Sequence, residues 1–336
     1  MKAARLYGVR DLRVEEVPDP EPGPGDLLID IKACGVCPSD LRAYQGTRIN
    51  PAQLPRTPGH EWAGIVVGVG EGVTGFAVGD RVVPDWRVVC GKCFNCRRGV
   101  FNYCTNLKHI RGGFCTLGVA PASNVRLIPA HVSFEQAAFC EPLACVINGS
   151  QACRIGIGDD VAIVGCGPIG LQHLQLAKAQ GARIIACDLD PKRLEKAKQL
   201  GAHDLVAVGE GDPVERVKAL TEGRGVDAAI VAVGDVRAAK QGIMMAGLNG
   251  RVQLFAGTYP SQEMPLDPNI IHYGQLFVTG SHDFTPHHFT TALKLISYGI
   301  VDVKTLISHR FPLERITDAF ETTGTRAGLK TMVLMD

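Results

Sequence analysis

The sequence predicts an α/β protein with two domains, one rich in β-strands and one built on a doubly wound parallel sheet. Three observations support this fold class. The chain has 336 residues, a length typical of two domains of ~100–200 residues each. Glycine and proline are concentrated in the first part, where short apolar runs are separated by turns. From about residue 149, apolar runs alternate instead with amphipathic helical segments.

The first part of the chain contains short runs typical of β-strands. These runs cover residues 27–33, 63–69 and 81–83, and glycine-rich turns separate them. The last segment has helical stretches near residues 286–298 and 313–322 and a strand at 330–334. We expect this segment to fold back onto the first domain. The predicted division is therefore residues 1–148 with 283–336 for the β-rich domain, and residues 149–282 for the parallel sheet.

Six predicted strands form the parallel sheet. Helix start signals separate them, because Asp190, Asp212 and Thr285 are N-cap residues that each precede a proline. Gly201 and Gly299 stand where two of the helices should end. Alternating strands and helices of this kind predict a doubly wound sheet. The strands are expected at residues 161–164, 183–187, 205–208, 228–233, 251–255 and 276–279.

Charge and hydropathy exclude several classes of partner. Lysine and arginine total 35 against 34 acidic residues, so no overall field attracts nucleic acid or an anionic membrane. No apolar stretch approaches the ~20 residues of a membrane span, and the first residues form no apolar signal-peptide core. The sequence therefore predicts a cytoplasmic protein whose partners are small molecules.

A glycine-rich motif follows directly on the first strand of the predicted parallel sheet. It opens a predicted helix at residues 171–180. Its glycines would make a tight turn, let the backbone approach a pyrophosphate and allow close helix packing. The helix N-terminus would then hold the phosphates of a dinucleotide. A plain glycine-rich turn is the alternative interpretation. The motif residues expected to contact the cofactor are Gly165, Gly167, Pro168, Ile169 and Gly170.

Asp188 ends the second strand of the predicted parallel sheet. A carboxylate there can accept hydrogen bonds from both adenosine ribose hydroxyls, whereas a 2′-phosphate would meet a like charge. The sequence therefore favours NAD over NADP. Arg193, in the next predicted helix, completes the expected cofactor-binding residues.

Four of the twelve cysteines lie in one short segment. Clustered thiols in a reducing compartment bind metal more often than they form disulfides. Four thiolates are the donor set of a closed structural zinc site, and basic residues on the same loop could offset their negative charge. The alternative is a metal-free cluster on a solvated basic loop. The four residues are Cys90, Cys93, Cys96 and Cys104.

A second set of candidate metal ligands is dispersed along the chain. Cys37, His60 and Glu61 offer sulfur, nitrogen and oxygen, the donors of a catalytic zinc site with an open position. With Zn²⁺ these three ligands sum to zero charge, and permanent ligation by Glu141 would make the site anionic. Our hypothesis is therefore that Glu141 is an exchangeable fourth ligand or a partner of the metal-bound water.

The order of these motifs resembles that of the zinc-dependent medium-chain alcohol dehydrogenases. The resemblance covers essentially the whole chain. It depends on Cys34-Gly35-Val36-Cys37-Pro38-Ser39-Asp40, Gly59-His60-Glu61, the four-cysteine loop, Glu141-Pro142-Leu143 and the glycine motif. The Gly-His-Glu and Glu-Pro-Leu elements are more similar to the sorbitol (polyol) and threonine dehydrogenase branch than to the liver alcohol dehydrogenase branch.

The resemblance implies a GroES-like catalytic domain made from both chain ends, an inserted Rossmann domain and a homo-oligomer, either a tetramer or a dimer. It implies two zinc ions, one at Cys37, His60 and Glu61 with Glu141 nearby, and one at the four-cysteine loop. It also gives Ser39 the role of relaying the substrate proton. Arg42 stands where many members have a histidine, and because arginine stays protonated it cannot pass a proton to solvent.

The implied activity is oxidation of an alcohol. Zinc would act as a Lewis acid on the substrate oxygen, Ser39 would remove the proton, and hydride would pass to NAD. We expect a secondary alcohol of a polyol or sugar, with a threonine-type amino alcohol as the alternative. A different class of function also fits, namely a non-catalytic NAD(H) sensor with one structural zinc. Residues that could contact substrate are Arg42, Tyr44, Trp86, His109 and His282.

Overall fold

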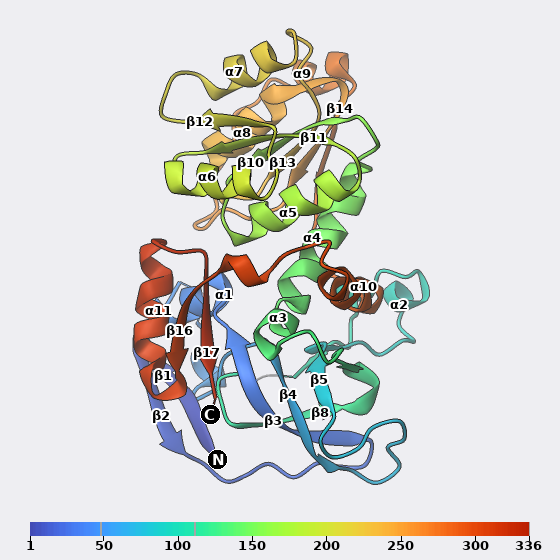
Figure 1. Cartoon of the computed structure of the whole chain (residues 1–336), viewed down its shortest axis with the longest axis vertical. Coiled ribbons are helices and arrows are strands. Elements are labelled where there is room, and N and C mark those ends of the chain that lie inside the picture. The colour runs from blue at the N-terminus through green and yellow to red at the C-terminus, as the bar shows by residue number, and fades with distance from the viewer. Residues whose placement is uncertain (48, 111, 336) are drawn as a thin grey trace. The chain divides into compact units, whose positions relative to one another are not determined.

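The computed structural model describes residues 1–47, 49–110 and 112–335. It divides the chain into two compact units, which are drawn in Figure 1. Unit 1 comprises Met1–Pro142 and Thr285–Asp336, and unit 2 comprises Leu143–Phe284. Helix α4 (Cys140–Cys153) contains the boundary between the first segment of unit 1 and unit 2.

Unit 1 is built on a sheet whose strands come from both ends of the sequence. In the described residues its order is β16-β17-β3-β4-β5-β9, with β8 paired to β3. The strands of the unit are β1 (Lys2–Gly8), β2 (Asp11–Glu16), β3 (Asp26–Gly35), β4 (Glu61–Val69), β5 (Arg81–Pro84), β6 (Arg87–Val88), β7 (Lys108–His109), β8 (Leu117–Pro121), β9 (Val125–Leu127), β16 (Ile307–Pro312) and β17 (Lys330–Leu334). The C-terminal strand β17 thereby lies against β3, with Val333 opposite Cys34.

Short helices connect and cover the strands of unit 1. They are α1 (Pro38–Tyr44), α2 (Phe94–Arg97), α3 (Phe134–Ala138), α10 (Pro286–Ser297) and α11 (Ile316–Thr325). Five 3₁₀ turns in the described residues lie at Pro51–Gln53, Phe101–Tyr103, Ala122–Asn124, Lys304–Leu306 and Leu313–Arg315. The core of the unit contains the fully buried rings of Trp62, Phe114 and Phe320, which fix the sheet against α11.

Unit 2 is a parallel sheet surrounded by helices (Figure 1). Its strand order in the described residues is β12-β11-β10-β13-β14-β15, the arrangement of a Rossmann fold. The strands are β10 (Asp160–Val164), β11 (Arg183–Asp188), β12 (Asp204–Ala207), β13 (Val226–Val231), β14 (Ala246–Leu254) and β15 (Phe277–Gly280). The helices are α5 (Pro168–Ala179), α6 (Pro191–Gln199), α7 (Pro213–Leu220), α8 (Val236–Met245) and α9 (Pro268–Gly274).

The predicted fold class is confirmed, and the expected helix caps are present. Asp190 accepts a hydrogen bond from the Lys192 N–H at 2.8 Å, and Asp212 does the same for Val214 at 2.8 Å. Helix α5 begins at Pro168 rather than at residue 171, because the fixed φ of proline already suits the first helical turn. Among the described residues, no helix is long and apolar enough to cross a membrane.

Candidate functional site

Three residues of the dispersed metal set lie together in unit 1. The candidate ligand atoms of Cys37, His60 and Glu61 all lie within 4.8 Å of one another. Cys37 is the N-cap of α1, Glu61 is the first residue of β4, and His60 directly precedes it. The combination of one sulfur, one nitrogen and one oxygen fits a catalytic zinc ion, which keeps a further position open.

Asp40, in the first turn of α1, orients Cys37 and His60. Its Oδ1 lies 3.6 Å from His60 Nδ1 and accepts the Gly59 N–H at 3.3 Å, and its Oδ2 accepts the Cys37 N–H at 3.2 Å. Burial disfavours the imidazolium, but Asp40 and Cys37 together hold the pKa of His60 well above its usual range. A carboxylate on Nδ1 leaves Nε2 as the metal-binding nitrogen.

Ser39 lies directly beside the candidate sulfur ligand. Its Oγ donates to Cys37 Sγ at 3.2 Å, and its backbone N–H lies 3.5 Å from the same sulfur. The hydroxyl predicted to relay a proton is therefore adjacent to the candidate sulfur ligand. Arg42 follows in the last turn of the same helix.

Lys330 forms an ion pair with Glu61 Oε2. The lysine side chain is 7% exposed and the glutamate 2%, so both charges are buried. Burial disfavours the charged amine, but the carboxylate of Glu61, with Cys37 and Glu141, raises the pKa of Lys330 above its usual value. The lysine also lies over the ring of Phe139, 5.8 Å from its centroid.

Glu141 lies in the first turn of α4 and is held by Trp86. The indole Nε1 of Trp86 donates to Glu141 Oε1 at 3.1 Å, and the same oxygen lies 3.9 Å from His60 Nε2. Trp86 stacks on His109 with a centroid distance of 4.7 Å and an interplanar angle of 20°. Glu141 is thus within reach of the candidate metal centre, outside the compact group of three.

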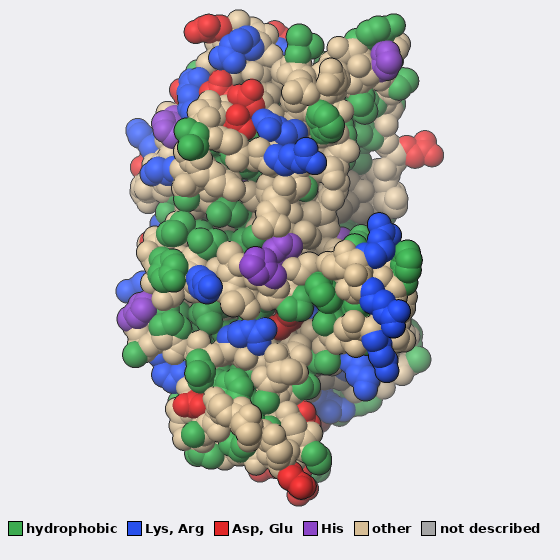
Figure 2. All heavy atoms as spheres, turned by 90° about the vertical axis from the view of Figure 1, so that its right-hand side faces the viewer, with side chains coloured by type: hydrophobic (Ala, Val, Ile, Leu, Met, Phe, Trp, Pro, Cys, Tyr) green, Lys and Arg blue, Asp and Glu red, His purple; other side chains and the backbone are tan. Residues whose placement is uncertain are grey.

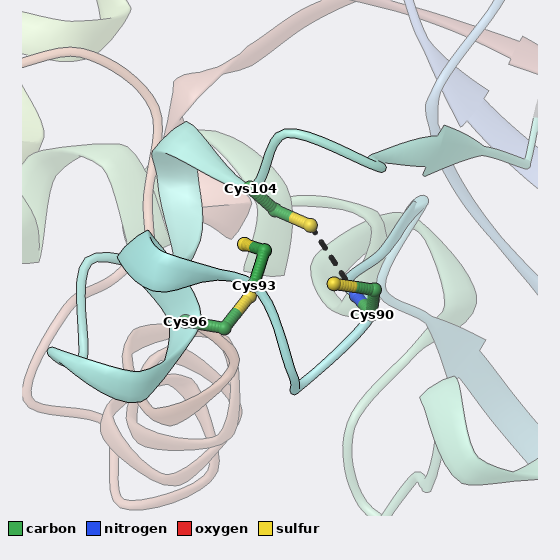
Figure 3. Close-up of side chains that lie close together, drawn as sticks. All are labelled: Cys90, Cys93, Cys96 and Cys104. Atoms are coloured by element: carbon green, nitrogen blue, oxygen red, sulfur yellow. Dashed lines mark hydrogen bonds between the residues drawn. The ribbon is translucent and has the colours of Figure 1, made fainter.

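The four-cysteine loop forms a second compact group. The sulfur atoms of Cys90, Cys93, Cys96 and Cys104 all lie within 4.8 Å of one another, and Figure 3 shows them converging from the loop and from α2. Cys104 Sγ accepts the backbone N–H of Cys90 at 3.3 Å. Backbone N–H groups lower the pKa of Cys93 to about 5, which favours the thiolate. The four donors fit a closed structural zinc site.

Four basic side chains lie on or next to this loop. Lys92, Arg97, Arg98 and Lys108 are all exposed. Figure 2 faces the side on which α2 lies in Figure 1 and shows Lys and Arg side chains gathered there. These charges offset the net negative charge that four thiolates would keep around a divalent ion.

The glycine motif forms the turn between β10 and α5. Gly165 has a φ of +95°, which favours glycine, and a Cβ on Gly170 would collide with the carbonyl oxygen of Gly165. Gly167 is the N-cap of α5 and supplies no side-chain acceptor for the first N–H groups of the helix. These N–H groups therefore suit the phosphates of a dinucleotide.

Asp188 lies at the end of β11, next to the glycine turn. Its Oδ2 accepts the Cys166 N–H at 2.6 Å and its Oδ1 accepts the Asp190 N–H at 2.8 Å, so the carboxylate is fixed against the turn. Arg193 Nη1 would lie 3.9 Å from a Cβ placed on Gly167. The predicted cofactor residues of unit 2 therefore gather around one helix N-terminus.

Two family models match this chain. The model described as alcohol dehydrogenase GroES-like domain matches residues 23–130, and the model described as zinc-binding dehydrogenase matches residues 168–298. Together they cover more than half of the sequence. The chain belongs to the zinc-binding alcohol dehydrogenase family. The predicted membership of this family is confirmed, and the sorbitol and threonine dehydrogenases described next confirm the predicted branch.

Several relatives in this family match the chain over nearly its whole length. The sorbitol dehydrogenase of Bacillus subtilis is 34% identical, covering 96% of this chain and 93% of the relative. The L-threonine 3-dehydrogenase of Pyrococcus abyssi is 36% identical, with the same coverage of 96% and 93%. A solved zinc-binding dehydrogenase structure from Sinorhizobium meliloti, bound to NADP, has a TM-score of 0.93 at 33% identity and covers 99% and 98% of the two chains.

The structure gives a place at the candidate site to three residues of this dehydrogenase that the sequence did not identify as part of it. Asp40 and Lys330 had no assigned role, and Trp86 was only a candidate for substrate contact. Tyr44, another such candidate, is a core residue, since it is 2% exposed and donates its hydroxyl to Glu321 at 2.9 Å. The spacing of Asp40 from Cys37 could have indicated a capping box, but no sequence signal connects Lys330 with Glu61.

Proposed function

We propose that this protein is a zinc-dependent oxidoreductase that transfers a hydride from a secondary alcohol of a polyol or sugar to NAD. The main support for this proposal is the compact group of Cys37, His60 and Glu61. Asp40 lies beside the imidazole of His60, and the hydroxyl of Ser39 lies beside the sulfur of Cys37. A purely structural protein of this fold has no need for a mixed donor set beside a proton-transferring hydroxyl.

Each side chain of the group has a separate role in the proposed reaction. Cys37, His60 and Glu61 would hold the zinc ion, which would supply Lewis-acid polarisation of the substrate hydroxyl. The Ser39 Oγ accepts the substrate proton as its own hydroxyl proton passes on to water or to the cofactor ribose, and Asp40 keeps the imidazole of His60 in the orientation that presents Nε2. Glu141 acts as an exchangeable fourth ligand or as a hydrogen-bond partner of water at the site.

The proposed metal content is two zinc ions per chain. The second ion is held by the four-cysteine loop, whose sulfur atoms converge in Figure 3. The number of ions separates this proposal from a non-catalytic NAD(H) sensor, which needs only the structural zinc. Metal analysis of the purified protein should therefore give about two zinc ions per chain for the enzyme and about one for the sensor.

NAD is the proposed cofactor. The Asp188 carboxylate is fixed at the end of β11 by two backbone N–H groups, so it would present a negative charge to a 2′-phosphate. NADP is present in the Sinorhizobium relative, and Arg193 near the glycine turn offers one positive charge. Initial rates with NAD and NADP at matched concentrations decide between them.

The amino alcohol threonine is a second candidate substrate, because the Pyrococcus relative is named for it. A panel of sorbitol, other polyols, sugars, threonine and simple alcohols, assayed with NAD, tests the proposal. Reduction of NAD by polyols above the rate with threonine supports the first choice. Absence of NAD reduction with every member of the panel, in protein that carries two zinc ions, would count against alcohol oxidation.

The proposed assembly is a homo-oligomer. Strand β15 is one of the two edges of the parallel sheet in the described residues, and its Phe277 and Tyr273 of the preceding helix α9 are 54% and 77% exposed. An exposed apolar edge strand favours pairing with a second copy of the same strand. Light scattering of the native protein and of a Phe277→Lys variant should show an oligomer that the variant weakens.

A further inference from the structure

Lys330 places a positive charge against a residue proposed to bind zinc. Its amine forms an ion pair with Glu61 Oε2, and the two side chains are 7% and 2% exposed. A buried ion pair gains little for stability over apolar residues of similar size.

The backbone is arranged to accommodate this pair. Gly35 lies opposite Glu61 in the pairing of β3 with β4, and opposite Met332 in the pairing of β17 with β3. A Cβ at position 35 would collide with Glu61 Oε2 and lie 2.8 Å from Lys330 Cε. The missing side chain of Gly35 thus leaves the space in which the lysine meets the carboxylate.

The lysine changes the charge balance of the proposed metal centre. A Cys37 thiolate, a neutral His60 and a Glu61 carboxylate neutralise Zn²⁺, and Lys330 brings the sum to one positive charge. The sequence-based count omitted this lysine and concluded that Glu141 would make the centre anionic. With Lys330 included, approach of Glu141 brings the total to zero. The charge objection to ligation by Glu141 is thereby removed.

We propose that Lys330 is a positioning residue of the zinc site. It occupies one carboxylate oxygen of Glu61, leaving the other for the metal, and it supplies the positive charge that allows Glu141 to approach. This inference rests on the proposed function, since it requires zinc at Cys37, His60 and Glu61.

The sign of the effect on zinc affinity distinguishes positioning from a merely structural role. The lysine repels a divalent cation and competes with it for Glu61, so its removal should tighten zinc binding. A lysine that only stabilised the fold would give the opposite result, because its loss would loosen the ligands. In a variant without the lysine, the buried charge of Glu61 has no partner, so it should destabilise the zinc-free form more than the zinc-bound form.

The experiment compares Lys330→Met, Lys330→Arg and the exposed control Lys304→Met in the full-length protein. Zinc affinity of the more weakly bound ion is measured by competition with a chelator, and melting temperatures are recorded with and without that ion. For Lys330→Met we expect zinc affinity to rise about tenfold, the zinc-induced rise in melting temperature to increase, and kcat to fall. Lys330→Arg and Lys304→Met should resemble the native protein.

Gly35→Ala is the second variant, since its methyl group separates Glu61 from Lys330 without removing either charge. If Lys330→Met does not fold, Gly35→Ala should still tighten zinc binding. Unchanged or weaker zinc affinity in the variant that folds overturns the inference. A native protein that binds only one zinc ion refutes the proposed function itself, so the two failures are distinguishable.

Discussion

Trp86 donates its indole N–H to Glu141 Oε1 at 3.1 Å. This hydrogen bond fixes a carboxylate whose Oε1 lies 3.9 Å from the Nε2 of His60. Lys330 does the same for Glu61. Both glutamates at the proposed zinc centre therefore have a partner that is not a candidate metal ligand.

Replacing Trp86 by phenylalanine removes the hydrogen bond while keeping an aromatic ring against His109. We expect kcat/KM to fall about tenfold, the value of one hydrogen bond to a charged acceptor. Steady-state kinetics of Trp86→Phe, Glu141→Gln and the double variant check this. Fully additive losses in the double variant would mean that the tryptophan does not act through Glu141.

Cys37→Ser should abolish turnover, by at least about 10³-fold, and leave NAD binding intact, because the glycine turn lies in another unit. Metal analysis of the variant should show loss of one zinc ion. Cys34→Ala is the matched control, since Cys34 is fully buried in the same strand-loop segment and is no member of the ligand group. Retained activity in zinc-depleted Cys37→Ser protein would refute the proposed mechanism.

Cys93→Ser should release the other zinc ion and lower the melting temperature by about 10 °C, because a structural metal contributes directly to the free energy of folding. Differential scanning calorimetry with parallel metal analysis checks this outcome. The same melting temperature in native protein and Cys93→Ser would show that the four-cysteine loop carries no metal that matters for stability.

Asp188→Ala should lower kcat/KM for NAD by about 10–100-fold, the value of one or two charged hydrogen bonds, and should reduce the preference over NADP. Asp190→Ala is the control, because Asp190 caps α6 through the Lys192 N–H. In the Asp190→Ala control the free energy of unfolding should fall by about 1 kcal/mol. Its preference for NAD over NADP should stay unchanged. An unaltered NAD to NADP ratio in Asp188→Ala would remove this residue from cofactor selection.

His173 in α5 provides a prediction about acid stability. It is fully buried, its two ring nitrogens have no hydrogen-bond partner among the described residues, and burial lowers its pKa to about 3. The unfolded chain binds a proton below pH ~6.5, whereas the folded chain does so only near pH 3. The stabilisation is therefore complete above pH ~6.5 and is lost as the pH falls toward 3.

Replacement of His173 by leucine should remove this pH dependence, a slope of about 1.4 kcal/mol per pH unit. Urea unfolding of the native protein and His173→Leu at several pH values between 4 and 7 measures the difference directly. Any zinc bound by the two proteins would be released over the same range, so the comparison cancels that contribution. Parallel pH profiles for the two proteins would contradict the burial argument.

The fold was predictable because its signals are local. Asp190 and Asp212 precede prolines and cap helices as their side chains dictate, and the apolar runs of the parallel sheet are long enough to identify as strands. Element ends were less predictable. The strand expected at residues 251–255 begins at Ala246, because pairing with β13 extends it beyond its apolar run.

The candidate site was predictable only where ligands occur in short motifs. Cys37, His60, Glu61 and the four-cysteine loop each belong to such motifs, and the structure brings each group together. Lys330 could not be found in this way, because its meeting with Glu61 depends on the pairing of β17 with β3 and on the space at Gly35. Long-range contacts of this kind have no sequence period.

The position of β17 has a consequence for how the protein is made. A ribosome completes β3 and β4, then all of residues 143–284, before it releases the strand that carries Lys330. During that interval Glu61 has no lysine partner and the β17 edge of β3 is unpaired. Until synthesis ends, the proposed zinc site therefore lacks the positive charge that admits Glu141, and products truncated before the last strand should be inactive however well unit 2 has folded.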